Sequence, residues 1–333
     1  MDVWTGTQVP RFVQRNVAAI TGHAAEQVHV HVLPMGGSFG HRLEDDFVRR
    51  AAEAAMAVPG TPVKTTLRRE EDMAHDYPRQ IAMARARGGV RDGRVDSLDL
   101  RIAMPSVTQS QMGRQGFSLP GPDPAIVLGA DDQPFDLPHC RVTGYRAPPL
   151  APVSSWPAVG ASTNVFFHES ALDELIHAAG ADPLEERLRL VDHAPSRAVL
   201  EAVGEMCGWA GPAIGAGRGR GLAYGFSFGV PVAEVVDVTV TGRGRRVDDV
   251  WVAADMGRVL DPVNFEGHVQ GGVVWALGHA IAAETTFADG RAEQVNYDRF
   301  PGMRMGQVPR IHVRALETGD EVRGIGGRWC RPP

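Results

Sequence analysis

The sequence predicts an α+β protein in which mixed β-sheets pack against helices. Short runs of alternating apolar and polar residues are bounded by turns that contain Gly and Asp, a pattern typical of strands and hairpins. Other segments carry apolar residues at helical spacing and are bordered by helix-capping residues. The 333 residues contain no internal repeat or low-complexity tract, so strands and helices are expected to alternate along a globular chain.

The first half of the chain is expected to join a strand to a helix through a glycine-rich loop and then to form a hairpin. The expected elements are a strand at 29–33, a helix from 43 to 56, a strand at 63–67 and a hairpin at 81–104 that turns at Asp92-Gly93. Residues 105–152 are rich in Pro, Gly, Ser and Asp. They predict a long loop or domain junction, through which substrate could pass, or equally a plain irregular connection.

The second half is expected to alternate helices with strands. The helix at 170–179 is closed by Gly180, and Asp182-Pro183 then supplies an N-cap with proline in the first turn of the next helix. The other expected elements are helices at 184–191, 196–209 and 265–283, strands at 232–240 and 247–253 joined by a turn at 241–244, a hairpin at 285–295 and a strand at 310–316.

Composition excludes several functional classes. The net charge of −6 and the pI near 6.1 argue against a nucleic-acid-binding protein, which needs a concentrated basic face. The basic run from Arg85 to Arg94 alternates with apolar residues and is expected to be the solvated face of the hairpin. Cys140, Cys207 and Cys330 lack metal-ligand spacing, so this chain alone cannot hold an iron–sulfur cluster. No apolar run has the length of a transmembrane segment, and the start lacks a signal-peptide core.

The glycine-rich loop is the strongest candidate binding feature. Gly36, Gly37, Ser38, Phe39 and Gly40 connect the strand to the helix, and glycines allow backbone N–H groups to approach an anionic ligand closely. The sequence matches neither a P-loop nor a dinucleotide-binding fingerprint. A turn that merely needs small residues explains the same pattern, and a nucleotide-binding α/β enzyme is a further alternative, which retention of NAD or FAD would support.

Two other groups of residues have simpler explanations. His29 and His31 share one face of the expected strand and would suit a two-histidine metal site, but no carboxylate or third ligand is paired with them in the sequence. Glu44, Asp45 and Asp46 suit the first turn of the following helix through the helix dipole, so they need no acid–base role.

A series of motifs resembles one family along nearly the whole chain, from Val3 to about Gly326. In chain order they are GGSFGHRLE at 36–44, DF at 46–47, PVK at 62–64, REEDM at 69–73, HDY at 75–77, ES at 169–170, DEL at 173–175, AAG at 178–180, DPL at 182–184, GLA at 221–223, ADMGRV at 254–259 and GGV at 271–273. The sequence resembles the molybdopterin-binding large subunit of the xanthine dehydrogenase and aldehyde oxidase family, and within that family the branch of the isoquinoline 1-oxidoreductase beta subunit.

The resemblance implies a fold like the molybdopterin-binding domains of that family and a molybdenum hydroxylase activity. Water would supply the oxygen that is added to an aldehyde or N-heteroaromatic carbon, and a molybdenum–pterin cofactor, as molybdopterin cytosine dinucleotide, would lie against Gly36, Gly37, Ser38, Phe39 and Gly40. Phe39 would lie beside the substrate. The [2Fe-2S] clusters would lie on a separate small iron–sulfur subunit, to which the electrons leave.

The resemblance also implies a division of the chain and a location in the cell. Residues 1–150 would form the first part of the molybdopterin-binding region, with the cofactor loop, and residues 151–333 the second part, with an incomplete C-terminus. The protein is expected to be cytoplasmic, and a periplasmic location is the alternative if an export signal belongs to a segment that precedes Met1.

Two departures from the family pattern bear on catalysis. The family's catalytic glutamate is expected in a Gly-Val-Gly-Glu motif, but its position is Gly327 here, and a glycine cannot accept a proton. Pro157 stands where the branch usually has an arginine, and proline offers no side-chain donor. No catalytic residue is therefore assigned to this chain.

The ends of the chain also depart from the family. The segment before Met1 is expected to be missing, and the resemblance stops between Gly326 and Arg328, as a frameshift or early stop would cause. We therefore expect a fragment of a large subunit, a split gene product that needs a second polypeptide, or a non-catalytic remnant or scaffold of the same fold.

Overall fold

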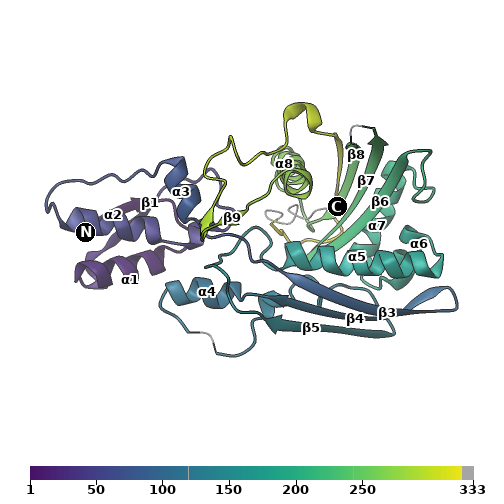
Figure 1. The fold of residues 1–333 in the computed structure, drawn as a ribbon, viewed down its shortest axis with the longest axis horizontal. Helices are drawn as coiled ribbons and strands as arrows, with labels where there is room; N and C mark the ends of the chain where they lie inside the picture. Colours follow the sequence, from purple (N-terminus) through teal and green to yellow (C-terminus); the bar gives the residue numbers. More distant parts are fainter. Residues whose placement is uncertain (119, 243, 325–333) are drawn as a thin grey trace.

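The computed structural model describes residues 1–118, 120–242 and 244–324. Within them the chain forms an α+β fold of four separate sheets with packed helices (Figure 1). The predicted fold class is therefore confirmed. No helix in these residues is both long and apolar enough to cross a lipid bilayer.

The N-terminal unit is a small βαβ arrangement followed by a helix, drawn in purple in Figure 1. It consists of β1 (Asp2–Thr5), α1 (Pro10–Thr21), the short 3₁₀ helix η1 (Ala25–Gln27), β2 (His29–Val32), η2 (His41–Leu43) and α2 (Asp46–Met56). Strands β1 and β2 are parallel, as a helical crossover requires. Apolar residues of α1, α2 and the approach to β2 form a separate core, which includes Val13, Val17, Val28 and Val48.

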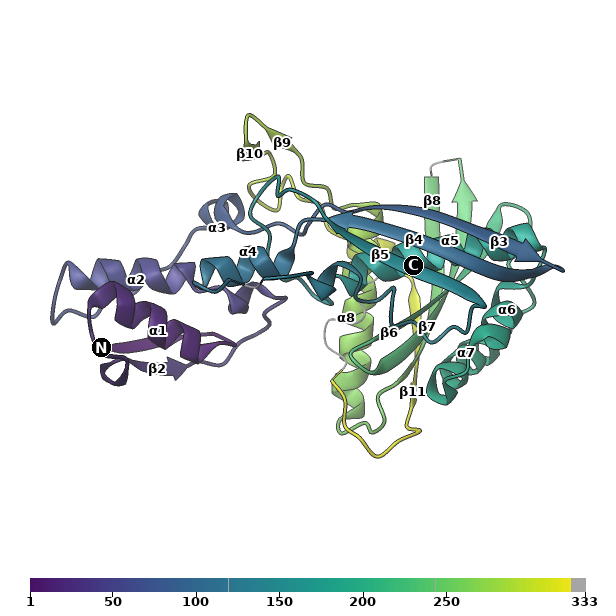
Figure 2. The same ribbon diagram turned by 90° about the horizontal axis from the view of Figure 1, so that it is seen from below.

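A three-stranded sheet with the order β3-β4-β5 forms the middle of the molecule. Its elements and those beside it are α3 (Arg69–His75), β3 (Met83–Arg91), β4 (Arg94–Met104), α4 (Val107–Arg114), η3 (Pro124–Ile126), β5 (His139–Arg146) and α5 (Ala161–Ala179). Helix α5 covers one face of the sheet, and α4 lies between the sheet and the N-terminal unit (Figure 2). Leu98, Leu100 and Ile102 of β4 point into the core beneath α5 because side chains alternate along a strand.

The last part of the chain is a four-stranded sheet with the order β11-β8-β7-β6. Its elements and neighbours are α6 (Pro183–Leu190), α7 (Ala194–Cys207), β6 (Arg218–Ser227), β7 (Val230–Thr241), β8 (Gly244–Asp255), α8 (Pro262–Ile281), β9 (Phe287–Ala288), β10 (Arg291–Ala292), η4 (Met305–Gln307) and β11 (Arg310–Leu316). Helices α7 and α8 cover opposite faces, so successive residues of β7 and β8 are buried on both sides.

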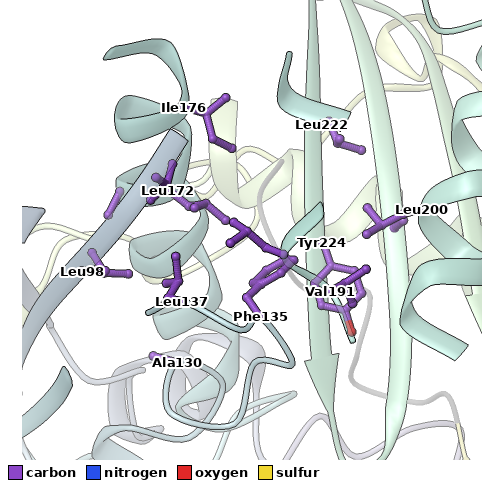
Figure 3. Packing of buried hydrophobic residues seen from close by; sticks show 14 of the residues in the cluster. Leu98, Ala130, Phe135, Leu137, Leu172, Ile176, Val191, Leu200, Leu222 and Tyr224 are labelled. Carbon is purple, nitrogen blue, oxygen red and sulfur yellow. The ribbon is translucent and has the colours of Figure 1, made fainter. Parts of the chain in front are cut away.

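The main hydrophobic core joins the middle sheet to the last sheet. Figure 3 shows Phe135, Leu172, Leu200 and Tyr224 meeting where α5, α7 and β6 converge. The ring of Phe135 packs edge-on against that of Tyr224, with 5.2 Å between centroids. This core fixes α5 and hence the segment that leads into it, which lies beside the candidate site.

A buried ion-pair network ties α5 to α6. The guanidinium of Arg187, which has no exposed surface, donates to Glu169 Oε2 at 3.1 Å and to Asp173 Oδ1 at 2.7 Å. The backbone N–H of Tyr224 also donates to Glu169 Oε2. Burial alone would raise the pKa of Glu169, but the charge of Arg187, the neighbouring His168 and the N–H of Tyr224 outweigh it and hold that pKa below its usual value. The motifs at 169–175 and Arg187 therefore have a structural role.

Most predicted elements are confirmed, with three errors. Residues 63–67 form no strand, because no neighbouring strand lies alongside to pair with them. Residues 105–152 are not merely a loop, since they contain α4 and β5, whose Arg and Thr residues hid the alternation. The helix expected at 170–179 begins earlier, at Ala161, because the segment before it is also buried against the core.

Candidate functional site

The glycine-rich loop has an unusual backbone. The φ angles of Gly37, Phe39 and Gly40 are 142°, 52° and 93°, and this left-handed region is costly for a side-chain-bearing residue such as Phe39. Within the described residues, the N–H groups of residues 36–40 have no hydrogen-bond partner. The loop therefore presents a row of available backbone donors, as an anion cradle requires.

Gly40 is required by close packing as well as by its backbone angle. A Cβ atom built on Gly40 would lie 1.7 Å from the carbonyl oxygen of Ser155. The backbone of residues 155–156 thus rests directly on the loop. In contrast, a Cβ atom on Gly36 would meet nothing within 4 Å.

A cavity of about 1480 Å³ opens beside the loop. Gly37, Ser38 and Phe39 line it, whereas Gly36 and Gly40 do not. The positive side chains in its wall are Arg42, Lys64 and Arg69, and the negative ones are Asp2, Asp72 and Asp76; the histidines His23 and His41 also line it. The structure therefore brings three of the five predicted cofactor-loop residues to the cavity, and Gly40 sets their position.

Aromatic side chains form one end of the cavity. The ring of Trp275, from α8, stacks at 6.1 Å between centroids on Phe39 and at 6.1 Å on Trp156. His279 packs against both tryptophans, and burial there lowers its pKa. Phe39 itself is 61% exposed, so its ring is available to a bound molecule.

Glu44 and Asp45 lie just before the first turn of α2, Asp45 as its N-cap residue, and both are almost fully buried in contacts with other side chains. Arg114 of α4 donates to both Glu44 oxygens, and Ser154 donates a third hydrogen bond at 2.5 Å. Asp45 accepts from Asn16 at 2.7 Å and pairs with Arg49 at 2.6 Å. Asp46 alone lies in the first turn of α2.

His41 links the loop to the end of α3. Its Nδ1 lies 2.9 Å from Asp76 Oδ1, and both residues line the cavity. The hydrogen bond from the imidazole to Asp76 raises the pKa of His41, with burial opposing it. This pair closes one side of the cavity between two segments that are far apart in the sequence.

Sequence reasoning missed Gln8, which contacts the loop directly. Ser38 Oγ donates a hydrogen bond to Gln8 Oε1 and also accepts one from the Arg42 N–H at 3.2 Å. Gln8 lies between β1 and α1, and its contact depends on the crossover that places this connection beside the loop. No local pattern around Gln8 indicates that contact.

The remaining predicted site residues are only partly accounted for. His31 pairs with Asp2 at 2.9 Å and stacks on Trp4, and no cluster of three metal-binding side chains occurs among the described residues. Pro157 lies in the segment that rests on the loop, where its carbonyl oxygen accepts a hydrogen bond from Arg79. Gly327 lies outside the described residues.

Comparison with known proteins identifies the family. Two molybdopterin cofactor-binding domain families match residues 1–191 and 164–309. The beta subunit of isoquinoline 1-oxidoreductase from Brevundimonas diminuta is 30% identical over 97% of this chain and 42% of its own length. A nicotinate dehydrogenase subunit from Pseudomonas putida is 26% identical over 96% of this chain and 29% of its own length. The chain thus spans less than half the length of these curated relatives.

Solved structures share the fold. Quinoline 2-oxidoreductase from Pseudomonas putida 86 aligns with a TM-score of 0.78 at 14% identity, over 99% of this chain and 67% of that one. Aldehyde oxidoreductase from Desulfovibrio gigas aligns with a TM-score of 0.74 at 14% identity, over 96% of this chain and 53% of that one. The family expected from the sequence motifs is therefore confirmed, and the chain belongs to the molybdopterin cofactor-binding domain family of the xanthine dehydrogenase and aldehyde oxidase type.

Proposed function

We propose that this chain is the cofactor-binding part of a molybdenum hydroxylase large subunit that acts on an aldehyde or an N-heteroaromatic ring. The observation that carries the proposal is the loop of available backbone donors beside a cavity of about 1480 Å³ in a chain of this family. The volume exceeds the roughly 300–1,000 Å³ of ordinary ligand pockets and leaves room for a large ligand such as a pterin dinucleotide.

The residues present fit such a cofactor. Its phosphate and pterin groups would accept hydrogen bonds from the N–H groups of Gly37, Ser38 and Phe39, which line the cavity between Gly36 and Gly40 and are not used inside the described chain. Arg42, Lys64 and Arg69 in the cavity wall supply positive charge for phosphates. We propose the cytosine dinucleotide form on the strength of the family resemblance.

Once bound, the cofactor would supply the oxidation chemistry that adds an oxygen from water to the substrate carbon. The chain's own residues would hold and orient it. Phe39 and Trp275 would shield one end of the cavity from water and offer flat surfaces to an aromatic substrate. Among the described residues we assign no general base, and the position of the family glutamate, Gly327, lies outside them.

We propose that further polypeptide complements the chain. The chain spans 42% of the Brevundimonas relative, which is itself called a subunit. A small iron–sulfur subunit with [2Fe-2S] clusters would accept the electrons, and a separate polypeptide would complete the cofactor site. We place the complex in the cytoplasm, with the periplasm as the alternative, and we assign the two parts of the site to residues 1–150 and 151–333.

A non-catalytic scaffold is the second candidate function. It is favoured by Pro157, where the resemblance predicts an arginine, and by the assignment of Gly327 to the position of the catalytic glutamate. Such a protein would keep the fold and the subunit contacts without turnover.

Metal analysis combined with an activity assay separates the two. The full chain should be produced together with its neighbouring gene products, and its molybdenum content measured by mass spectrometry. Dye-linked oxidation of quinoline and benzaldehyde should then be assayed. Stoichiometric molybdenum with turnover supports the hydroxylase, molybdenum without turnover supports the scaffold, and absence of molybdenum contradicts the cofactor assignment.

A further inference from the structure

Residues 157–160 form a turn with an unfavourable backbone. Ala158 and Val159 have φ angles of 61° and 48°, in the region that normally requires glycine. For a β-branched residue such as Val159 this conformation is a genuine outlier, because Cβ crowds the following carbonyl. Two consecutive residues of this kind persist only where neighbouring groups hold them.

Arg79 contributes to that restraint, beside the backbone hydrogen bond from the Val159 N–H to the Trp156 carbonyl oxygen at 2.8 Å. Its guanidinium donates to the carbonyl oxygen of Pro157 at 3.4 Å, to that of Val159 at 3.4 Å and to the hydroxyl of Ser162. These three acceptors lie at the start of the turn, within it and just after it. The planar fork of an arginine can reach several acceptors at once, whereas lysine offers a single point of charge.

The turn carries Trp156 into the wall of the cavity. The indole N–H of Trp156 donates to the carbonyl oxygen of Tyr77 at 2.9 Å, and the guanidinium of Arg79 lies 5.6 Å from the indole ring. The segment just before β3 therefore contacts both Trp156 and the turn that follows it. On its far side, a Cβ atom on Gly160 would lie 1.8 Å from the carbonyl oxygen of Ala125, so the end of the turn cannot shift outward.

We propose that Arg79 is a positioning residue that holds the left-handed turn at Ala158 and Val159 and thereby sets Trp156 against Phe39 and Trp275 at the end of the cavity. The guanidinium that contacts the turn belongs to Arg79. It does not come from position 157, where the family resemblance predicts an arginine and this chain has proline. Loss of Arg79 releases the strain of the turn and moves Trp156 out of its stack. The consequence for cofactor retention rests on the proposed function, whereas the position of Trp156 does not.

The test uses ¹⁹F NMR of the full chain labelled with 5-fluorotryptophan. The sequence contains six tryptophans, and the Trp156 signal is assigned by its loss in Trp156→Phe. In Arg79→Ala we expect the Trp156 signal to shift or broaden while those of Trp4 and Trp209 stay unchanged. Arg79→Lys should restore it only in part.

Glycine at the strained position should remove the need for the arginine. Because a left-handed non-glycine residue disfavours the turn by roughly 5- to 30-fold in population, Arg79→Ala/Val159→Gly is expected to sharpen the Trp156 signal and return it toward the wild-type position, apart from the direct effect of removing the guanidinium beside its ring. Val159→Gly alone should leave the signal unchanged. Arg85→Ala, which removes an exposed arginine of β3, serves as the matched control.

Several results would overturn the proposal. These are an unchanged Trp156 signal in Arg79→Ala, an equal change in the Arg85→Ala control, or no recovery in the double variant. If Arg79→Ala does not fold, recovery of folded protein in the double variant supports the proposal and failure to recover contradicts it. Molybdenum content, measured in parallel, should fall in Arg79→Ala and return in the double variant. Absence of molybdenum from the wild type contradicts the proposed function and leaves the NMR result intact.

Discussion

At the scale of single residues, the candidate site depends on Gly40 and Glu44, whose surroundings leave little room for another side chain or charge. Gly40 combines a φ angle of 93° with a backbone contact to Ser155 that leaves no room for a side chain. Glu44 is 1% exposed and receives three hydrogen bonds, so its charge is fully compensated only while Arg114 and Ser154 stay in place. Both residues fix the cofactor loop against later parts of the chain.

Gly40→Ala is expected to lower the free energy of unfolding by about 2–4 kcal/mol, because it adds left-handed strain and a steric clash. Gly36→Ala is the matched control, since nothing lies near its added Cβ and its φ is not left-handed. Thermal denaturation of both variants checks the stability, and molybdenum analysis checks cofactor retention. Equal stability of the two variants would contradict the packing argument.

Glu44→Gln is expected to lower the free energy of unfolding by about 2–4 kcal/mol, because it leaves the Arg114 guanidinium without its counter-charge in a mostly buried place. Urea denaturation measures the change. Glu53→Gln, on the exposed face of α2, should be neutral. A loss in Glu44→Gln no larger than that in Glu53→Gln would show that the buried pair contributes little.

At the scale of elements, the end of α3 is joined to the residue after the glycine-rich loop by the hydrogen bond between Asp76 and His41, and the imidazole of His41 titrates. His41 has a raised pKa because Asp76 binds its protonated form, and Asp72 adds to this while Arg42 opposes it. A raised folded-state pKa stabilises the folded protein fully below the ordinary histidine value of 6.5. That contribution is lost as the pH rises through the folded-state pKa.

The stability difference between wild type and Asp76→Asn is therefore expected to be largest below pH 6.5 and to shrink above it. Urea unfolding of both proteins at a series of pH values between 5 and 9 measures it. The difference should become independent of pH in the His41→Gln background. A difference that grows with rising pH would have the wrong sign and would refute the assignment.

Elements with a regular pattern could be predicted from the sequence, and elements defined by pairing could not. Turn residues indicate the hairpin around Asp92-Gly93, and the capping residue Asp182 indicates the start of the next helix. Residues 63–67 have strand-like composition but no partner, whereas β5 has a partner in β4 but an interrupted pattern. Strand formation depends on neighbours that a local pattern does not contain.

The same limit applies to the candidate site. The loop at 36–40 is predictable because glycines and a strand–loop–helix order are local features. The contacts of Gln8 with Ser38 and of Arg79 with Val159 join segments far apart in the sequence. The contact of Glu44 with Arg114 could not be predicted for the same reason, since Arg114 lies on another helix.

At the scale of the whole molecule, the N-terminal unit has its own small core. Val17 belongs to that core and Leu172 to the main one, and both are fully buried. The unit is held to the rest largely by polar contacts, such as Arg15 to the Gln115 carbonyl at 2.7 Å and the Glu44–Arg114 pair. It therefore has the features of a locally unfolding unit.

Native-state hydrogen exchange should show that Val17→Ala, which costs about 2 kcal/mol, lowers protection only in α1, β2 and α2. Leu172→Ala, which costs about 3 kcal/mol, should lower the protection of the slowest-exchanging amides in α5 and β7. If Val17→Ala reduced protection equally across the chain, the two cores would have to unfold together.

The contact between Gly40 and the Ser155 carbonyl has a consequence for the order in which the parts of the site fold. The cradle and the wall behind it come from segments separated by α2, α3, the β3–β4 hairpin and β5, so a large loop must close before they touch. Such distant pairings form slowly and late. During synthesis the loop at 36–40 cannot pack against residues 155–156 until that segment has emerged and folded. The proposed anionic ligand would therefore find only part of its site before then.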